Sequence, residues 1–315
     1  MTQETQIKQK YSPYPDIAQN ESSVYPYAIE KVGMRQVEIP ILIEDENGSY
    51  VRQPALIDVY VDLKEPFAKG IHMSRLFNIL VSYFESTPLS LVNIRKLLEA
   101  LSQSQQSISS KSYLKLSYQH ILKKKALLSQ SKGWRYYPIS YDFSYENKTL
   151  KTELQFEVTY SSTCPCSAAL SRQLIQQKFD HHFSSQGTLS QKEVSQWLEK
   201  KENSGGAPHS QRSTGKVKLC FSQDNMPGVS NLINDIEESL KTPVQASVKR
   251  VDEQEFAKLN AENLMFCEDA VRILKHHFES KDFILDYKIE VEHFESLHPH
   301  NAVAIAVKGI PNGYK

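Results

Sequence analysis

Two short segments carry the side chains best suited to metal chemistry in this chain of 315 residues. The first reads Thr-Cys-Pro-Cys-Ser at 163–167, and the second reads Gly-Ala-Pro-His-Ser-Gln-Arg-Ser at 206–213. Together they offer thiols, an imidazole, an amide and a guanidinium beside proline and glycine. Cysteine and histidine are common zinc ligands and need not be close in sequence. We expect both segments to be loops at the ends of regular elements, where a rigid scaffold positions a site.

The Cys-Pro-Cys spacing by itself is weak evidence for a metal. Free cysteine is frequently a small buried hydrophobic residue, so Cys164 and Cys166 also fit a core. No second pair with the spacing of a zinc ribbon is present. A disulfide between residues two apart would be strained.

Three other places offer polar chemistry in the second half of the chain. Lys-Arg-Val-Asp-Glu at 249–253 ends a strand-like run at 244–248, and Glu268 lies early in a predicted helix. His298 and His300 occupy the loop between the last two predicted strands, where glycine, asparagine and aspartate are the usual turn residues. Each residue alone is ordinary on a surface. Together with Cys164 they suit Zn²⁺ or a related divalent ion with one position open for water.

Composition narrows the class of protein. Lysine plus arginine is 37 and aspartate plus glutamate is 37, so the net charge is zero and a general nucleic-acid binder is not expected. Four cysteines in a chain of this length do not make a disulfide framework, which favours a reducing cytoplasm. Residues 1–9 are polar, unlike a signal peptide, and no stretch approaches the roughly 18 to 20 apolar residues of a membrane span. We therefore expect a soluble cytosolic protein without nucleic-acid or membrane partners.

Hydrophobic periodicity predicts the elements that must position these residues. The first half should contain strands at 36–44, 55–63, 113–122 and 134–145, with helices beginning near 73 and near 88. The second half should contain strands at 152–161, 216–221, 283–294 and 302–307, with helices at 226–240 and 264–278. The order strand, strand, helix, helix, strand, strand occurs twice, which predicts an α+β fold of two antiparallel sheets with helices on one face. Joining the open sheet edges would give an oligomeric barrel.

The predicted domain boundaries follow from this repeat. Residues 1–25 read as a flexible arm, 26–148 as the first module and 149–315 as the second module. A polar insertion at about 173–205 should hold one or two helices. Within it, His181 and His182 are adjacent and would not share a helix face, so we do not expect them to be ligands. The run Lys123–Lys125 is predicted to be a solvated turn.

Several motifs in order resemble the type IB GTP cyclohydrolases. They are Gly-Ile-His-Met-Ser-Arg at 70–75, Thr-Cys-Pro-Cys-Ser at 163–167, Pro-His-Ser-Gln-Arg-Ser at 208–213, Lys-Arg-Val-Asp-Glu at 249–253, Glu-Asp at 268–269 and Glu-Ser-Leu-His-Pro-His-Asn at 295–301. The matches run from about residue 30 to the C-terminus. The family has a tandem, bimodular T-fold and assembles as a homotetramer, which agrees with the doubled β2α2β2 pattern. Two features depart from many members: the segment before His209 is longer, and the motif has Pro-His-Ser where Ala-His-Asn is frequent.

The resemblance implies a reaction and a set of residues. GTP and water would give 7,8-dihydroneopterin triphosphate and formate, an entry step to folate-type pterins and to 7-deazaguanine compounds. A bound divalent ion (Zn, Mn or Fe) would lower the pKa of water from about 15.7 towards 7 and supply hydroxide for attack on guanine C8. The implied metal ligands are Cys164, His209, Glu253 and His298. Cys164 would also act on intermediates, Cys166 would be structural, and Glu268 would accept bonds from the guanine edge.

The remaining implied roles concern protons, phosphates and assembly. His300 would carry protons. The residues implied for the triphosphate are His72, Arg75, Arg212, Lys249 and Arg250, with Ser74 and Gln211 as secondary candidates. The active site would lie at a subunit interface, so His72 and Arg75 would serve a neighbouring subunit's metal. Two alternatives stay open: another T-fold purine or pterin enzyme, such as a nitrile reductase or an aldolase, and a non-catalytic metal-binding T-fold protein.

Overall fold

The computed structural model describes residues 16–45, 48–222 and 226–315. The chain forms two compact units, which are described separately. Among the described residues, unit 1 comprises 16–45, 48–118, 140–153 and 226, and unit 2 comprises 119–139, 154–222 and 227–315. Strands β3, β4 and β5 each have residues in both units. Neither unit is therefore one continuous stretch of the chain. The module boundaries predicted from the sequence stay predictions, and residues 1–15 of the predicted arm lie outside the described residues.

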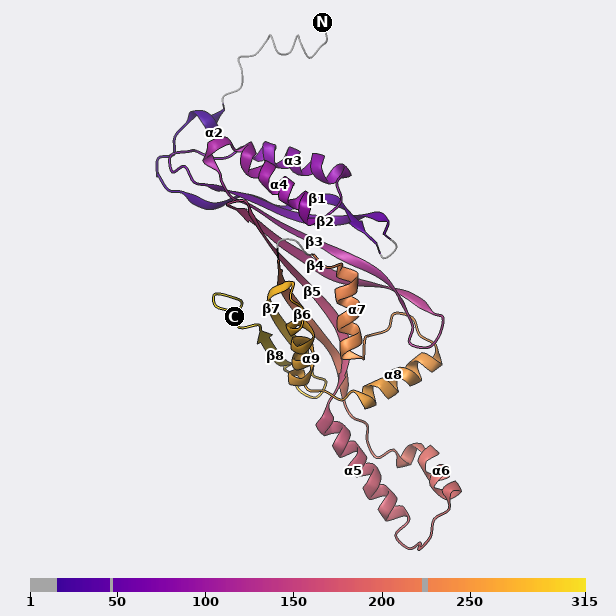
Figure 1. Cartoon of the computed structure of the whole chain (residues 1–315). Helices are drawn as coiled ribbons and strands as arrows, with labels where there is room; N and C mark the ends of the chain where they lie inside the picture. Colours follow the sequence, from indigo (N-terminus) through magenta and orange to yellow (C-terminus); the bar gives the residue numbers. More distant parts are fainter. Residues whose placement is uncertain (1–15, 46–47, 223–225) are drawn as a thin grey trace. The chain divides into compact units, whose positions relative to one another are not determined.

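The described strands form a sheet in which sequence order is also spatial order, from β1 to β8 (Figure 1). The strands are β1 Ile29–Glu44, β2 Tyr50–Leu63, β3 Ser112–Lys125, β4 Lys132–Glu146, β5 Thr149–Thr163, β6 Ser210–Phe221, β7 Ile284–His293 and β8 Ala302–Val307. The pairs β1–β2, β2–β3, β6–β7 and β7–β8 are antiparallel. In β3 buried and less buried residues alternate through most of the strand, as expected when one face of a sheet is covered.

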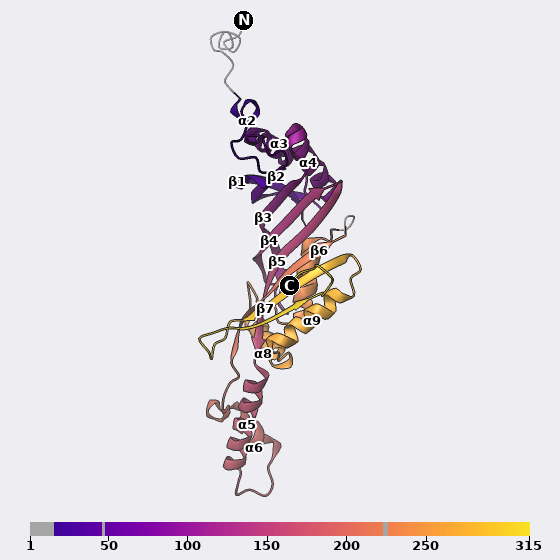
Figure 2. The same cartoon turned by 90° about the vertical axis from the view of Figure 1, so that its left-hand side faces the viewer.

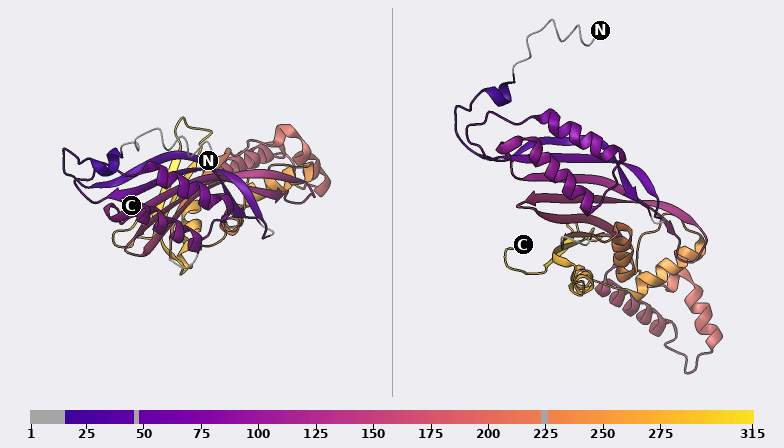
Figure 3. Two further views of the ribbon diagram at one scale, coloured as in Figure 1. Left: turned by 90° about the horizontal axis from the view of Figure 1, so that it is seen from above. Right: turned by 45° about the horizontal axis from the view of Figure 1, so that its top comes forward.

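Unit 1 buries the apolar faces of two helices. Helices α3 (Met73–Ser86) and α4 (Leu91–Ser104) lie over β1 and β2 in Figure 3. Leu76 and Leu80 are one turn apart on α3 and fully buried, which matches the helical spacing in the sequence. Ser90 caps α4 by accepting a hydrogen bond from the Asn93 N–H at 3.3 Å. The helix begins at Leu91, three residues after the predicted Pro88. Helix α2 (Ile17–Asn20) and a 3-10 turn, η1 (Gln106–Ile108), complete the unit.

Unit 2 has three helices after β6 within its described residues: α7 Val229–Leu240, α8 Arg250–Glu262 and α9 Cys267–Glu279. The prediction of a strand-like run at 244–248 was wrong, because only Pro243 makes an isolated bridge, to Tyr160. Helix α8 follows instead and is fixed by the buried Asp252. Its carboxylate accepts from the Lys249 N–H at 2.7 Å and from the N–H groups of Leu128 and Ser129 at 2.8 Å. A side-chain hydrogen bond from Ser129, followed by these backbone bonds, holds the pKa of Asp252 well below its usual range.

The segment between β5 and β6 contains the helices predicted for the insertion. Helix α5 (Pro165–His182) and helix α6 (Gln191–Glu199) extend away from the strands of their unit in Figure 2. A short turn, η2 (Lys201–Asn203), leads back towards β6. Phe179 packs edge-on against the buried Trp197, with ring centroids 5.4 Å apart. This aromatic contact joins α5 to α6. His181 and His182 are exposed in the last turn of α5.

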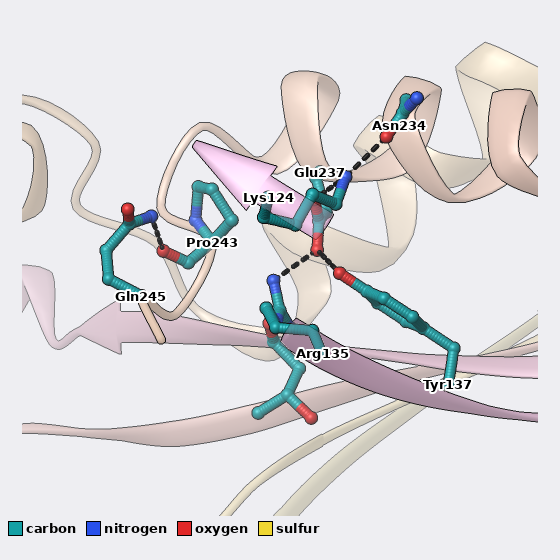
Figure 4. A network of polar contacts seen from close by, with 8 residues as sticks. Lys124, Arg135, Tyr137, Asn234, Glu237, Pro243 and Gln245 are labelled. Atoms are coloured by element: carbon teal, nitrogen blue, oxygen red, sulfur yellow. Dashed lines mark hydrogen bonds and ion pairs between the residues drawn. The ribbon is translucent and has the colours of Figure 1, made fainter. Parts of the chain in front are cut away.

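The prediction that Lys123–Lys125 is a solvated turn was wrong about the turn, because these residues belong to β3, and wrong about solvation for Lys124, which joins a polar network inside unit 2 (Figure 4). These lysines end β3, and Lys124 Nζ lies 2.7 Å from Oε2 of Glu237 on α7. Arg135 from β4 contacts Oε1 of the same carboxylate at 2.5 Å. The Tyr137 hydroxyl donates to that oxygen at 2.7 Å. Glu237 is buried, and a buried carboxylate is stable only when such partners replace water.

We expect Tyr137→Phe to lower the free energy of unfolding by about 1.5–3 kcal/mol, the usual contribution of a hydrogen bond to a charged group. Tyr136→Phe is the matched control, because its neighbouring side chain is 64% exposed whereas Tyr137 is 1% exposed. The control should change the free energy by no more than about 0.5 kcal/mol. Urea unfolding of both variants beside the parent measures the difference. Equal midpoints for the two variants would show that the Tyr137 hydroxyl makes no net contribution.

Candidate active site

The end of β5 and the start of β6 bring the two metal-type segments together. The Cys164 N–H donates to the His209 carbonyl at 3.3 Å, although 45 positions separate them in the chain (209 minus 164). Cys164 is the N-cap of α5, and Pro165 occupies the first helical position, which suits proline because that N–H has no helical partner. The Cys164 side chain is half-buried. A thiol and an imidazole are thus held at one junction by backbone geometry.

The imidazole of His209 is held from two sides. Its backbone N–H donates to Ser167 Oγ at 3.1 Å, which fixes the chain beside the first turn of α5. Its Nδ1 lies 3.1 Å from Oε1 of Gln211 and 4.0 Å from Oε2 of Glu295. The His209 and Glu295 side chains are 21% and 14% exposed. The ring therefore has its Nδ1 edge engaged in the protein.

Gln211 and Arg212 lie within β6, not in a loop before it as the sequence suggested. Gln211 is buried, and its Nε2 donates to Ser162 Oγ at 2.9 Å. The Ser162 and Ser213 hydroxyls lie 2.7 Å apart, and both residues are fully buried. Both ends of the Gln211 amide are therefore bonded inside the protein. Arg212, one position along the strand, is exposed on the opposite face.

A second cluster gathers at the start of α9. The Cys267 thiol donates to Glu268 Oε2 at 3.2 Å, and the Tyr160 hydroxyl lies 2.8 Å from Nε2 of His293, the last residue of β7. The backbone N–H of Glu268, then the Cys267 thiol, lower the pKa of the Glu268 carboxyl. Burial lowers the pKa of His293 to about 4, with Glu268 opposing that shift, and burial raises the pKa of Cys267 to about 11. Near neutral pH, Glu268 is a carboxylate beside a neutral imidazole.

The other residues implied for the site in unit 2 are exposed. Glu253 lies in the first turn of α8, after Lys249 and Arg250 at its start. His298 and His300 lie in the loop between β7 and β8, with parallel rings whose centroids are 5.1 Å apart. Stacking orients both imidazoles in the same way at the loop surface.

Two of the three residues implied for the triphosphate in unit 1 line a cavity of about 260 Å³. His72 and Arg75 line it together with Glu21, Glu65 and Gln105. The His72 Nε2 is 3.6 Å from Asp16 Oδ2, and its backbone N–H donates to Gln105 Oε1 at 2.8 Å. Arg75 donates to the Ser104 carbonyl at 2.9 Å, and Ser74 is exposed on α3. Arg75 and the His72 imidazole face a pocket, but acidic side chains share its rim.

The donor chemistry of the Cys164–His209 junction fits a divalent metal, since a soft thiolate and an imidazole are typical zinc ligands. Among residues 16–45, 48–222 and 226–315, no three His, Cys, Asp or Glu side chains form a metal-binding group. The structure therefore joins Cys164 to His209 in one chain and does not gather Glu253 and His298 with them. The four-ligand set stays a prediction.

Sequence reasoning did not single out Ser162, Ser213, Tyr160, His293 or Glu295 as site residues. Serine and tyrosine in a strand carry no distinctive spacing, and His293 stands alone in a strand pattern. Glu295 had a signal, because it opens the same short motif that ends in His298 and His300.

Comparison with known proteins identifies close relatives. A sequence model of the family described as type I GTP cyclohydrolase FolE2 matches residues 14–304. The GTP cyclohydrolase FolE2 of Hydrogenovibrio crunogenus is 44% identical over 300 residues, covering 95% of this chain and 96% of that protein. The protein with the same name from Pseudoalteromonas translucida is 44% identical over 302 residues, covering 96% and 99%.

Solved structures show the fold. A hyper-thermostable mutant of a uricase (AgUricase) superimposes with a TM-score of 0.50 and 7% identity, covering 90% of this chain and 94% of that one. At that identity the likeness concerns the fold alone. The α+β tandem T-fold expected from the sequence is confirmed.

Proposed function

This chain belongs to the type I GTP cyclohydrolase family FolE2, and on that premise we propose that it converts GTP and water into 7,8-dihydroneopterin triphosphate and formate. The observation that carries the proposal is the backbone contact between Cys164 and His209, which joins the two metal-type motifs at one place. The product is a precursor of folate-type pterins and of 7-deazaguanine compounds.

We assign a divalent metal, Zn²⁺, Mn²⁺ or Fe²⁺, to Cys164, His209, Glu253 and His298. The half-buried thiol and the imidazole with an engaged Nδ1 support the first two ligands. When bound, such an ion supplies hydroxide at neutral pH for attack on guanine C8. Since Glu253 and His298 are exposed on separate segments, closing the set requires movement or a contribution from another subunit.

The chain's own residues bind and orient the substrate. Glu268 is kept ionised by its backbone N–H and the Cys267 thiol, so it can accept bonds from N1–H and the 2-amino group of guanine. Cys164 acts on intermediates as well as serving as a ligand, and His300 carries a proton at the exposed loop.

The triphosphate needs cations and N–H donors, and we assign His72, Arg75, Arg212, Lys249 and Arg250 to it, with Ser74 as a further donor. His72 and Arg75 line the cavity of unit 1, which supports their use as a group. Gln211 is not kept as a phosphate contact, because both ends of its amide are bonded inside the protein.

We further propose that the protein works in the cytoplasm as a homo-oligomer, with a tetramer as the expected state and sites at subunit interfaces. None of the helices in the described part of the chain has the length and hydropathy of a transmembrane segment.

Formate release from GTP tests the proposal directly. The purified protein is stripped with a chelator and then resupplied separately with Zn²⁺, Mn²⁺ and Fe²⁺. We expect turnover to fall below detection on stripping and to return with at least one ion, because hydroxide at neutral pH depends on the metal. Formate also separates this reaction from that of a nitrile reductase, which would consume a nicotinamide cofactor. No formate with any ion, from a folded oligomer, would exclude the cyclohydrolase.

A further inference from the structure

We propose that Gln211 is a positioning residue that fixes the tautomer of His209, with the proton on Nδ1 and the lone pair on Nε2. The inference rests on the proposed function in one respect, since it takes His209 to be a metal ligand. It gives the buried Gln211 a role different from the phosphate contact that its motif implies.

The geometry places the Gln211 amide between the imidazole and a buried pair of hydroxyls. Oε1 lies 3.1 Å from His209 Nδ1, and Nε2 lies 2.9 Å from Ser162 Oγ. Ser162 in turn lies 2.7 Å from Ser213 Oγ, and neither serine is exposed. Ser162 lies in β5, and Gln211 and Ser213 lie in the neighbouring strand β6. A side chain bonded at both ends inside a sheet has little freedom to rotate.

Two proton arrangements satisfy the contact between His209 and Gln211. Either Nδ1–H donates to the amide oxygen, or an amide N–H donates to a bare Nδ1. The surroundings favour the first arrangement. The amide nitrogen faces Ser162 and the amide oxygen faces the ring, and Glu295 Oε2 lies 4.0 Å from the same Nδ1. An ionised carboxylate only accepts hydrogen bonds, so it favours a proton on Nδ1.

The tautomer decides which ring nitrogen of His209 can bind a metal. With Nδ1 protonated, the lone pair of the neutral ring is on Nε2, on the far side from Gln211 and Glu295. Histidine ligands commonly donate their other ring N–H to an acceptor in this way, and loss of that acceptor typically weakens metal binding by about 10- to 100-fold.

The test compares Gln211→Leu with Gln211→Glu and a matched control, Thr163→Val. Leucine removes the acceptor for Nδ1–H, whereas glutamate keeps an acceptor at the same length. Thr163 is next to Ser162, but its hydroxyl bonds to Ser210 and Asn260 and not to Gln211. The valine variant therefore removes a nearby hydroxyl and leaves the contacts of Gln211 in place. The ring tautomer is read from ¹⁵N shifts of labelled histidine in the metal-free protein, assigned with His209→Ala. Zn²⁺ affinity is measured by competition with a chromophoric chelator.

We expect the parent, Gln211→Glu and Thr163→Val to show the Nδ1–H tautomer, and Gln211→Leu to lose it and bind Zn²⁺ about 10- to 100-fold more weakly. An Nε2–H tautomer in the parent would overturn the proposal. So would a leucine variant that keeps both the parent tautomer and the parent affinity. Neither readout uses GTP, so a failure of the cyclohydrolase reaction is distinguishable from a failure of this inference.

Discussion

Replacing Cys164 or His209 with alanine should reduce formate release from GTP to below about one-thousandth of the parent rate, because hydroxide is scarce at neutral pH without the metal. Each residue supplies one donor at the junction of β5, α5 and β6, and the backbone bond between them does not depend on either side chain. The variants should therefore fold. Activity is followed as formate, and circular dichroism checks the fold. We expect His298→Ala to behave in the same way, since it is the ligand assigned from the last loop.

Cys166→Ala is the matched control for this experiment. Cys166 lies two positions after Cys164, is exposed, and takes no part in the proposed site. Its variant should keep the parent rate within about twofold, as an ordinary surface substitution does. Parent-like turnover in all three ligand variants would remove the metal assignment. If Cys166→Ala lost turnover and Cys164→Ala kept it, Cys166 and not Cys164 would be the metal ligand.

Glu268→Gln should lower kcat/KM for GTP by about 10²- to 10⁴-fold, since two hydrogen bonds to a charged group contribute about 1.5–3 kcal/mol each. The parent should also prefer GTP over ITP, which lacks the 2-amino donor, by about 10- to 150-fold from one such bond. The glutamine variant should lose most of that preference. Steady-state kinetics with GTP and ITP, on the parent and on Glu268→Gln, measures how far the preference for the 2-amino group depends on the Glu268 carboxylate.

Asp269→Asn is the control of the same chemistry at the next position. Asp269 accepts from the Phe266 N–H at 3.0 Å and so caps α9 without belonging to the proposed guanine site. Its variant should keep the GTP-to-ITP preference. A Glu268→Gln protein that still discriminates as the parent does would show that another group reads the guanine edge.

The contribution of Glu268 to guanine binding should change with pH in one direction. The pKa of Glu268 is below the ordinary value of 4.5, so the carboxylate that accepts from guanine stays charged as the pH falls to that value. Its contribution to binding is lost only as the pH falls further, through the lowered pKa.

The sequence by itself determined the repeating elements and the motifs. Long apolar patterns such as the one around Leu76 and Leu80 were sufficient, because the period of a helix or strand is a local property. Strand β8 was predicted with its exact bounds, and one or two helices were predicted for the segment that holds α6 and the second half of α5. The ordered motifs identified the family, and matching relatives confirm it.

Only the tertiary structure decided which side chains meet. Helix α8 was missed because its start depends on Asp252, which is bonded to residues more than 120 positions earlier (252 minus 129 is 123). Lys124 reads as a solvated residue until Glu237 of α7 is placed beside it. Gln211 reads as a loop donor, yet β6 turns it inward onto Ser162. Hydrogen bonds of this kind join residues remote in the chain, and local periodicity carries no information about them.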